Sequence, residues 1–180
     1  ALAAPGALEI ARPGEIRAIS LRILGMLNAN LGEKAKAELI YKRSVAILEK
    51  TLGPDHPDLA SDLSHLADAC QAQGKLAEAE RLFKRSLSIR EKALGPDDPE
   101  LADELSAVAG QIEYGEYAEE LYKRALAINE KAFGPNHFRV AACLDDLARF
   151  LRAAKREKEA GELEARAARI RAIRSCCVPG

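Results

Sequence analysis

The 180-residue sequence is poor in the residues that build β-sheets. It has no tryptophan, its aromatic content is 4%, and valine, isoleucine and threonine occur 4, 11 and 1 times. β-branched and aromatic side chains are the ones that favour strands. Alanine and leucine, which both favour helices, occur 34 and 24 times. We therefore predict an all-α protein.

Three further shortages exclude classes of protein. Lysine plus arginine number 27 against 28 acidic residues, and this balance argues against a nucleic-acid binder, which usually carries a basic excess. No apolar run approaches the roughly 18–20 residues that a membrane-spanning helix needs. The cysteines (Cys70, Cys143, Cys176 and Cys177) are too sparse for a disulfide framework, so we expect a reducing, cytoplasmic environment.

The strongest positive signal is an internal repeat. Gly53-Pro54, Gly95-Pro96 and Gly134-Pro135 recur at spacings of 42 and 39 residues, each in a similar context. A second set of strings lies upstream of them: YKRSVAILEK, FKRSLSIREK and YKRALAINEK. A period of 20–50 residues is typical of stacked helical units, each of which buries its apolar face only against its neighbours.

Within each repeat the apolar residues follow the period of an α-helix. We expect the first helix of each pair to bury one stripe of residues. The clearest stripes are Leu59, Leu63, Leu66, Ala67 and Cys70 in the second repeat and Val140, Leu144, Leu147, Ala148 and Leu151 in the fourth. The corresponding stripe of the first repeat is Leu21, Leu24, Gly25 and Asn28. His56 and Asp98, each followed by a proline, are placed as helix N-caps. His137 occupies the turn equivalent to that of His56. We interpret both histidines as helix N-caps rather than as ligands of a shared metal site.

The chain is expected to hold four antiparallel helix pairs, over residues 15–52, 57–94, 99–133 and 138–174. Residues 1–14 form a lead-in and residues 175–180 a tail that includes Cys176 and Cys177. The sequence opens on Ala1 rather than methionine, so we expect a fragment or a processed product. Leu66 to Ala79 spans 13 positions while the matching Val108 to Ala118 spans 10, which predicts a shortened helix or a tight connection near residues 111–116.

The string from Leu63 to Leu87 resembles a tetratricopeptide repeat. The positions that carry the resemblance are Leu63, Leu66-Ala67, Cys70, Gly74, Ala79 and Phe83. The 42-residue period with GPDHPDLA resembles the kinesin-light-chain-type subgroup, and the likeness covers roughly residues 15–174. The fourth repeat departs from it, with Lys155 at the turn glycine and Glu164 at the aromatic. HEAT repeats share the period and are the alternative, but they do not predict the G-x-x-A-E-A-E-x-x-F string.

The resemblance implies a right-handed α-solenoid that acts as a protein- or peptide-binding scaffold or adaptor, with no cofactor, no metal and no catalysis. The charge balance and the lack of a long apolar run predict no nucleic-acid or membrane partner, while self-association through the ends of the solenoid is a further possibility. Carried over residue by residue, the concave groove would be lined by Arg22, Met26, Asn30, Ser64, Asp68, Gln71, Ser106, Asp145, Arg149 and Arg152. The subgroup usually carries L-N-N-L in this helix, and this chain has LSHL, LSAV and LDDL instead.

Two other functions are kept as alternatives. The chain could be the regulatory or sensor segment of a larger multidomain protein. A hydrolase-like enzyme would rest only on Ser61, His65 and Asp68, which share one helical face but have no oxyanion hole evident in the sequence. The Arg-, Ala- and Glu-rich end of the fourth repeat is interpreted as a terminal cap with a polar outer face, against docking on a further repeat.

Overall fold

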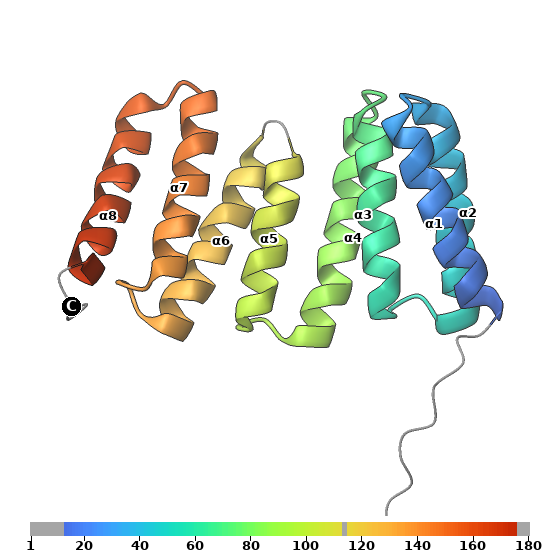
Figure 1. Cartoon of the computed structure of the whole chain (residues 1–180), viewed down its shortest axis with the longest axis horizontal. Helices are drawn as coiled ribbons and strands as arrows, with labels where there is room; N and C mark the ends of the chain where they lie inside the picture. Colours follow the sequence, from blue (N-terminus) through green and yellow to red (C-terminus); the bar gives the residue numbers. More distant parts are fainter. Residues whose placement is uncertain (1–12, 113–114, 176–180) are drawn as a thin grey trace, which may run out of the picture. The chain divides into compact units, whose positions relative to one another are not determined.

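The structure is a computed structural model that describes residues 13–112 and 115–175. Within these ranges the regular structure consists of helices, with no strand, so the prediction of an all-α fold is confirmed (Figure 1). The helices are α1 (Pro13–Asn30), α2 (Lys34–Leu52), α3 (Pro57–Gln71), α4 (Leu76–Leu94), α5 (Pro99–Gln111), α6 (Glu116–Phe133), α7 (Phe138–Ala153) and α8 (Glu157–Ser175).

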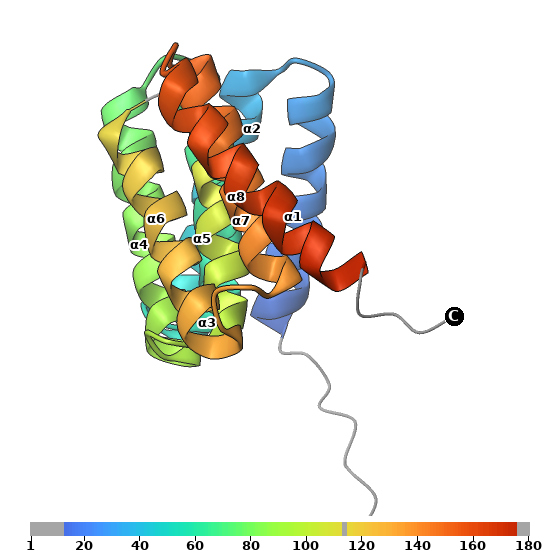
Figure 2. The same ribbon diagram turned by 90° about the vertical axis from the view of Figure 1, so that its left-hand side faces the viewer.

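The helices fall into two units, residues 1–89 and residues 90–180. In the first unit α1 and α2 form a hairpin, α3 packs on α2, and α4 returns along α3. In the second unit α5 pairs with α6, α7 packs on α6, and α8 returns along α7. Figure 2 shows α8 lying against α7 from a second direction. Both units therefore repeat one arrangement, a hairpin covered by the first helix of the next hairpin.

Three helices begin at a side-chain cap. His56, Asp98 and His137 each accept a hydrogen bond from the backbone N–H two residues later, at 3.3, 2.8 and 3.3 Å. In α3 and α5 a proline occupies the first turn, where its missing N–H costs no helical hydrogen bond. The capping role predicted for both histidines is confirmed.

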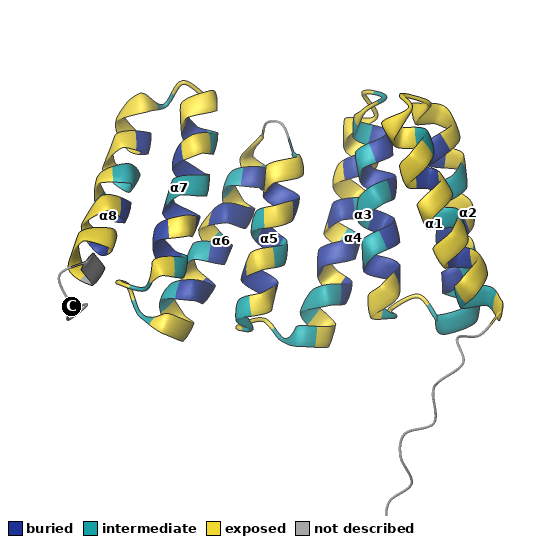
Figure 3. Ribbon diagram, in the orientation of Figure 1, coloured by how far each residue is buried: buried dark blue, intermediate teal, exposed yellow. Residues whose placement is uncertain are grey.

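The predicted apolar stripes of α3 and α7 are buried throughout (Figure 3). The stripe predicted in the first repeat is only partly right. Gly25 is buried, but Leu24 is 46% exposed, whereas Leu66, its equivalent 42 residues later, is 4% exposed. The reason is that α3 packs between α2 and α4, while among the described residues no helix covers the corresponding side of α1.

The turn inside the fourth hairpin keeps its shape without glycine. Lys155 has φ 61°, close to the 79° and 77° of Gly32 and Gly74 in the equivalent turns. The left-handed conformation costs a side-chain-bearing residue about 1–2 kcal/mol. The fourth hairpin therefore keeps the repeat's geometry at some cost in stability.

The irregular third repeat has a short first helix, as predicted. α5 has 13 residues against 15 in α3 and ends at Gln111. Part of the connection predicted near residues 111–116 lies outside the described residues, as do most of the lead-in and, in the tail, Cys176 and Cys177. None of the helices in the two described ranges has both the length and the apolar character needed to cross a membrane.

Candidate functional site

A cavity of about 310 Å³ lies between α1, α2 and α3 of the first unit. This is the lower end of the size range in which small-molecule and side-chain pockets occur. Its lining combines apolar walls with a few polar groups, and consists of Met26, Ala29, Asn30, Lys34, Ala37, Tyr41, His65, Asp68, Ala69 and Ala72.

Small residues open this cavity and two rings form one of its walls. Tyr41 and His65 stack with ring centroids 5.5 Å apart and planes within 13°. Tyr41 can approach α1 because residue 25 is glycine, and a Cβ atom there would lie 2.6 Å from the tyrosine Cε1. The sequence therefore places the aromatic wall by pairing a glycine on α1 with a tyrosine on α2.

The polar groups of the cavity are partly withdrawn from water. Burial raises the pKa of Asp68 to about 6. Burial, together with the nearby charges of Asp68 and Asp62, raises the pKa of Tyr41 to about 12. At the rim, Lys34 Nζ donates to the carbonyl of Ala72 at 2.9 Å. The cavity thus offers a carboxyl group in a desolvated setting beside apolar walls, an arrangement that suits a ligand carrying hydrogen-bond donors.

Three of the predicted groove residues line this cavity: Met26, Asn30 and Asp68. The others in the first unit lie outside it. Arg22 donates to the buried carboxylate of Asp62 at 3.3 Å. The hydroxyl of Ser64 lies 2.9 Å from that of Ser86, and Gln71 is half-buried beyond the lining.

The predicted residues of the second unit are engaged mainly within its last hairpin. Arg149 pairs with Asp146 at 2.7 Å. Arg152 pairs with Glu164 of α8 at 2.8 Å, and Asp145 pairs with Arg171 of the same helix. Both arginines remain exposed, so their charges face solvent as well as their partners. Ser106, on α5, is half-buried.

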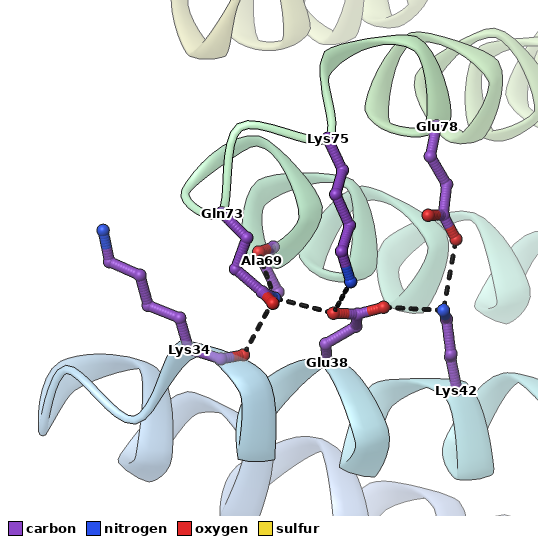
Figure 4. Close-up of polar contacts among 7 residues, drawn as sticks. All are labelled: Lys34, Glu38, Lys42, Ala69, Gln73, Lys75 and Glu78. Atoms are coloured by element: carbon purple, nitrogen blue, oxygen red, sulfur yellow. Dashed lines mark hydrogen bonds and ion pairs between the residues drawn. The ribbon is translucent and has the colours of Figure 1, made fainter.

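An ion-pair network that the sequence did not indicate lies beside the cavity (Figure 4). The carboxylate of Glu38, 6% exposed, accepts hydrogen bonds from Lys42 and Lys75 at 2.6 Å and from Gln73 at 2.7 Å. Hydrogen bonds from the two ammonium groups lower the pKa of Glu38 to about 2, against the opposing effect of burial. The only sequence signal was an acidic residue three positions before the tyrosine of YKRS.

One group of side chains has the composition of a metal site. Potential ligand atoms of Glu38, Cys70 and Glu78 all lie within 4.8 Å of one another. Lys42 bridges the two carboxylates, at 2.6 Å from Glu38 and 3.2 Å from Glu78. Burial is the main reason that the pKa of Cys70 is raised to about 11, which disfavours the thiolate that would bind a metal. The arrangement is therefore better described as an ion-pair network than as a metal centre.

The serine, histidine and aspartate that motivated the hydrolase alternative all lie on α3. The ring of His65 is stacked on Tyr41, and its Nδ1 is buried with no hydrogen-bond partner in the described part of the chain. A general base needs one ring nitrogen held by an orienting group and the other directed at the nucleophile. The position of His65 provides a wall for the cavity, and the geometry gives no support to a triad.

Comparisons with known proteins agree with the repeat pattern. A family model for the tetratricopeptide repeat matches residues 15–92, 63–109 and 116–172. No curated protein matches the sequence. Among solved structures, the nearly identical TPR-like repeats of a Podosopora anserina protein designated a kinesin light chain superpose with a TM-score of 0.74 at 27% identity, over 91% of this chain and 80% of that one.

Two further structures show the same likeness. A single-substitution variant of the Podosopora anserina protein gives a TM-score of 0.73 at 27% identity, over 94% of this chain and 80% of that chain. BtubC (BKLC) from P. vanneervenii gives a TM-score of 0.72 at 18% identity, over 96% of this chain and 70% of that chain, and shares the fold.

Proposed function

Because the chain belongs to the tetratricopeptide repeat family, we propose that it is a non-catalytic, cytoplasmic scaffold or adaptor that binds a protein or peptide ligand. The observation that carries this proposal is the cavity between α1, α2 and α3. Three of its lining residues, Met26, Asn30 and Asp68, belong to the groove that the family resemblance implies. The cavity and the family resemblance therefore both favour a ligand that binds on the first helices of the hairpins.

The cavity is suited to one side chain of a peptide rather than to a cofactor. Its walls of alanine, Met26 and the ring of Tyr41 can bury an apolar stem, while Asn30 and Asp68 can meet polar groups. Peptide grooves in general combine such a pocket with polar contacts that fix the direction of the chain. In the second unit, exposed Arg149 and Arg152 are suited to carboxylates, and Ser106 and Asp145 are the other residues of the proposed groove there.

The proposal is tested by selecting peptides from a displayed random library on the full chain and measuring their affinity by calorimetry. Ala29→Gln places a larger side chain in the cavity and should weaken the selected peptides at least about tenfold, roughly 1.4 kcal/mol. Ala77→Gln, at an exposed position of α4, is the matched control and should bind as the wild type does. Equal affinity in both variants would exclude the cavity.

The second unit has its own test. Arg149→Glu combined with Arg152→Glu reverses two exposed charges and should lower the affinity and the salt dependence for acidic peptides. Unchanged binding of such peptides would remove these arginines from the proposed groove. The alternative, that the chain serves as the sensor segment of a larger protein, shares the same binding surface and differs in having an effector attached.

A further inference from the structure

The cavity between α1, α2 and α3 has an exposed mouth and a buried interior. The exposed residues of its lining are Met26, Ala29, Asn30, Lys34 and Ala72, and the buried ones are Ala37, Tyr41 and Ala69. His65 and Asp68 are half-buried, which places them between the mouth and the interior. Since the alanines and Met26 form apolar walls, a side chain that enters from solvent passes these walls before it reaches Asp68.

The carboxyl group of Asp68 is not required by the packing of the repeat. The equivalent positions of the other repeats are occupied by Met26, Gly110 and Arg149. Burial and then the charge of Asp68 raise the pKa of Tyr41, whose ring is 2% exposed, so the carboxyl group lies near the interior of the cavity. Burial of this group raises its own pKa and so reduces stability at neutral pH. A polar group that costs stability in a cavity is typical of a binding site.

Hydrogen-bond acceptors from different helices surround the cavity. Asn30 of α1 offers an amide carbonyl, and Asp68 of α3 offers a carboxylate. The Nδ1 atom of His65 is buried and has no hydrogen-bond partner among the described residues, which costs free energy unless a ligand pairs with it. The lysine of the lining, Lys34, is exposed and donates to the carbonyl of Ala72. A positively charged ligand group is therefore complementary to the cavity, and a negatively charged group is not.

Lysine is the peptide side chain that best combines these requirements. Its methylene stem can pack against apolar walls, and its compact ammonium group directs three donors away from one another. The acceptors on α1 and α3 are likewise spread around the cavity. Arginine carries its donors in one plane, which suits a single carboxylate better than acceptors on separate helices.

We propose that the cavity binds a lysine side chain of the peptide ligand, with the methylene stem between Met26 and the alanines and the ammonium group on the carboxylate of Asp68. Asn30 and the Nδ1 atom of His65 accept the remaining donors. This inference rests on the proposed function, because it specifies which residue of the peptide the cavity receives. An arginine or an apolar residue in the same place is the alternative, and variants of the peptide distinguish the three.

The first test uses the peptides selected from the displayed random library on the full chain, with affinities measured by calorimetry. Peptides that Ala29→Gln weakens should share one lysine. Replacing this lysine by norleucine, which keeps the stem and lacks the ammonium group, should weaken binding about tenfold or more, because a charged hydrogen bond is lost. Arginine in its place should bind more weakly than lysine. Equal or tighter binding of the norleucine or the arginine peptide would overturn the proposal.

Substitution of Asp68 tests whether the lysine and this carboxyl group meet. Asp68→Asn should weaken the lysine peptide about tenfold and leave the norleucine peptide nearly unchanged, because the lost interaction requires both partners. Asp58→Asn, which removes an exposed carboxyl group from the first turn of the same helix, is the matched control and should bind both peptides as the wild type does. Equal losses for the two peptides in Asp68→Asn would indicate a structural role and contradict the proposal.

The pH dependence of binding gives a readout that a packing role would not change. The titratable groups of the lining are Lys34, Tyr41, His65 and Asp68. Because the pKa of Asp68 is about 6, the fraction of ionised carboxylate should fall about tenfold from pH 7 to pH 5, and the affinity for the lysine peptide should fall with it. Asp68→Asn keeps His65, so its pH dependence measures the contribution of the histidine and should be smaller. An equal fall in both proteins would contradict the proposal.

The proposed function and the lysine site fail in different ways. Peptides that Ala29→Gln weakens but that share no lysine would overturn the lysine site and leave the peptide-binding function standing. Peptides whose affinity Ala29→Gln does not change would exclude the cavity and therefore both proposals.

Discussion

Lys75, in the turn between α3 and α4 of the second hairpin, donates to the carboxylate of Glu38 in the first hairpin at 2.6 Å. Lys42 donates to the other oxygen of the same carboxylate from within α2, also at 2.6 Å. Because Glu38 is buried, its charge depends on these two lysines for compensation. The contact therefore ties the two hairpins of the first unit together.

Glu38→Gln should lower the free energy of unfolding by about 2 kcal/mol at pH 7, since it leaves two ammonium groups without their carboxylate. The folded-state pKa of about 2 lies below the ordinary value of 4.5, so the native state holds the proton more weakly than the unfolded state. The stabilisation is present above about pH 4.5 and is lost as the pH falls toward 2. Urea unfolding at several pH values measures it.

The matched control for this variant is Glu80→Gln. Glu80 is the residue equivalent to Glu38 in the second repeat, but it is exposed and pairs with Lys84 on the surface. Its loss should change the stability by less than about 0.5 kcal/mol, as for exposed ion pairs in general. An equal loss of unfolding free energy in Glu38→Gln and Glu80→Gln would show that the buried network contributes no more to stability than an exposed ion pair.

Gly25→Ala should destabilise the first unit by about 1–3 kcal/mol, because the added methyl group would overlap the ring of Tyr41 and displace it. Thermal unfolding followed by circular dichroism would detect this loss. Gly161→Ala is the control, since a Cβ atom there meets nothing within 4 Å. Within α8 that substitution should instead stabilise by about 0.5–1 kcal/mol. Two changes of the same sign would be inconsistent with the contact described.

Lys155→Gly should raise the free energy of unfolding by about 0.5–1 kcal/mol, because glycine adopts the left-handed conformation without steric cost. The reciprocal change, Gly74→Lys, should lower it by about 1 kcal/mol at the equivalent turn of the second hairpin. Both effects can be read from urea unfolding curves. A loss of stability in Lys155→Gly would mean that the lysine side chain supports the turn.

Asp68→Asn should stabilise the protein at pH 7 by about 1 kcal/mol, a value kept small because the carboxyl group is only partly buried. The pKa of Asp68 in the folded state, about 6, lies above the ordinary 3.8, so the native state binds the proton more tightly. Ionisation therefore reduces stability as the pH rises from about 4 through 6. The difference between the two proteins should vanish near pH 4, and a carboxyl carbon titration by NMR should show a midpoint near 6.

The helical class and the repeat family can be predicted from local sequence patterns, without knowledge of tertiary contacts. The buried stripe from Leu59 to Cys70 and the Gly-Pro marks at the ends of α2, α4 and α6 both arise from local periodicity and turn chemistry. The shortened α5 followed from a count of residues between equivalent positions. Each of these features depends on neighbours within one hairpin, which the sequence displays directly.

The cavity and the Glu38 network were beyond the same reasoning. Both depend on which side chains from separate hairpins meet, as in the stacking of Tyr41 on His65. Leu24 was expected to be buried because the sequence pattern of α1 matches that of α3, but burial also requires a covering helix. The apolar pattern indicates which helix face is suited to burial, and only the structure shows whether another helix covers that face.

Met26 provides the most direct measurement of the central claim, because it is the only methionine in the sequence and lines the cavity. Its methyl group, labelled with ¹³C, reports on the cavity alone in an NMR titration with a selected peptide. The account predicts that the methyl resonance shifts and saturates with the dissociation constant found by calorimetry. A peptide that binds with the same affinity while the Met26 resonance stays in place would contradict it.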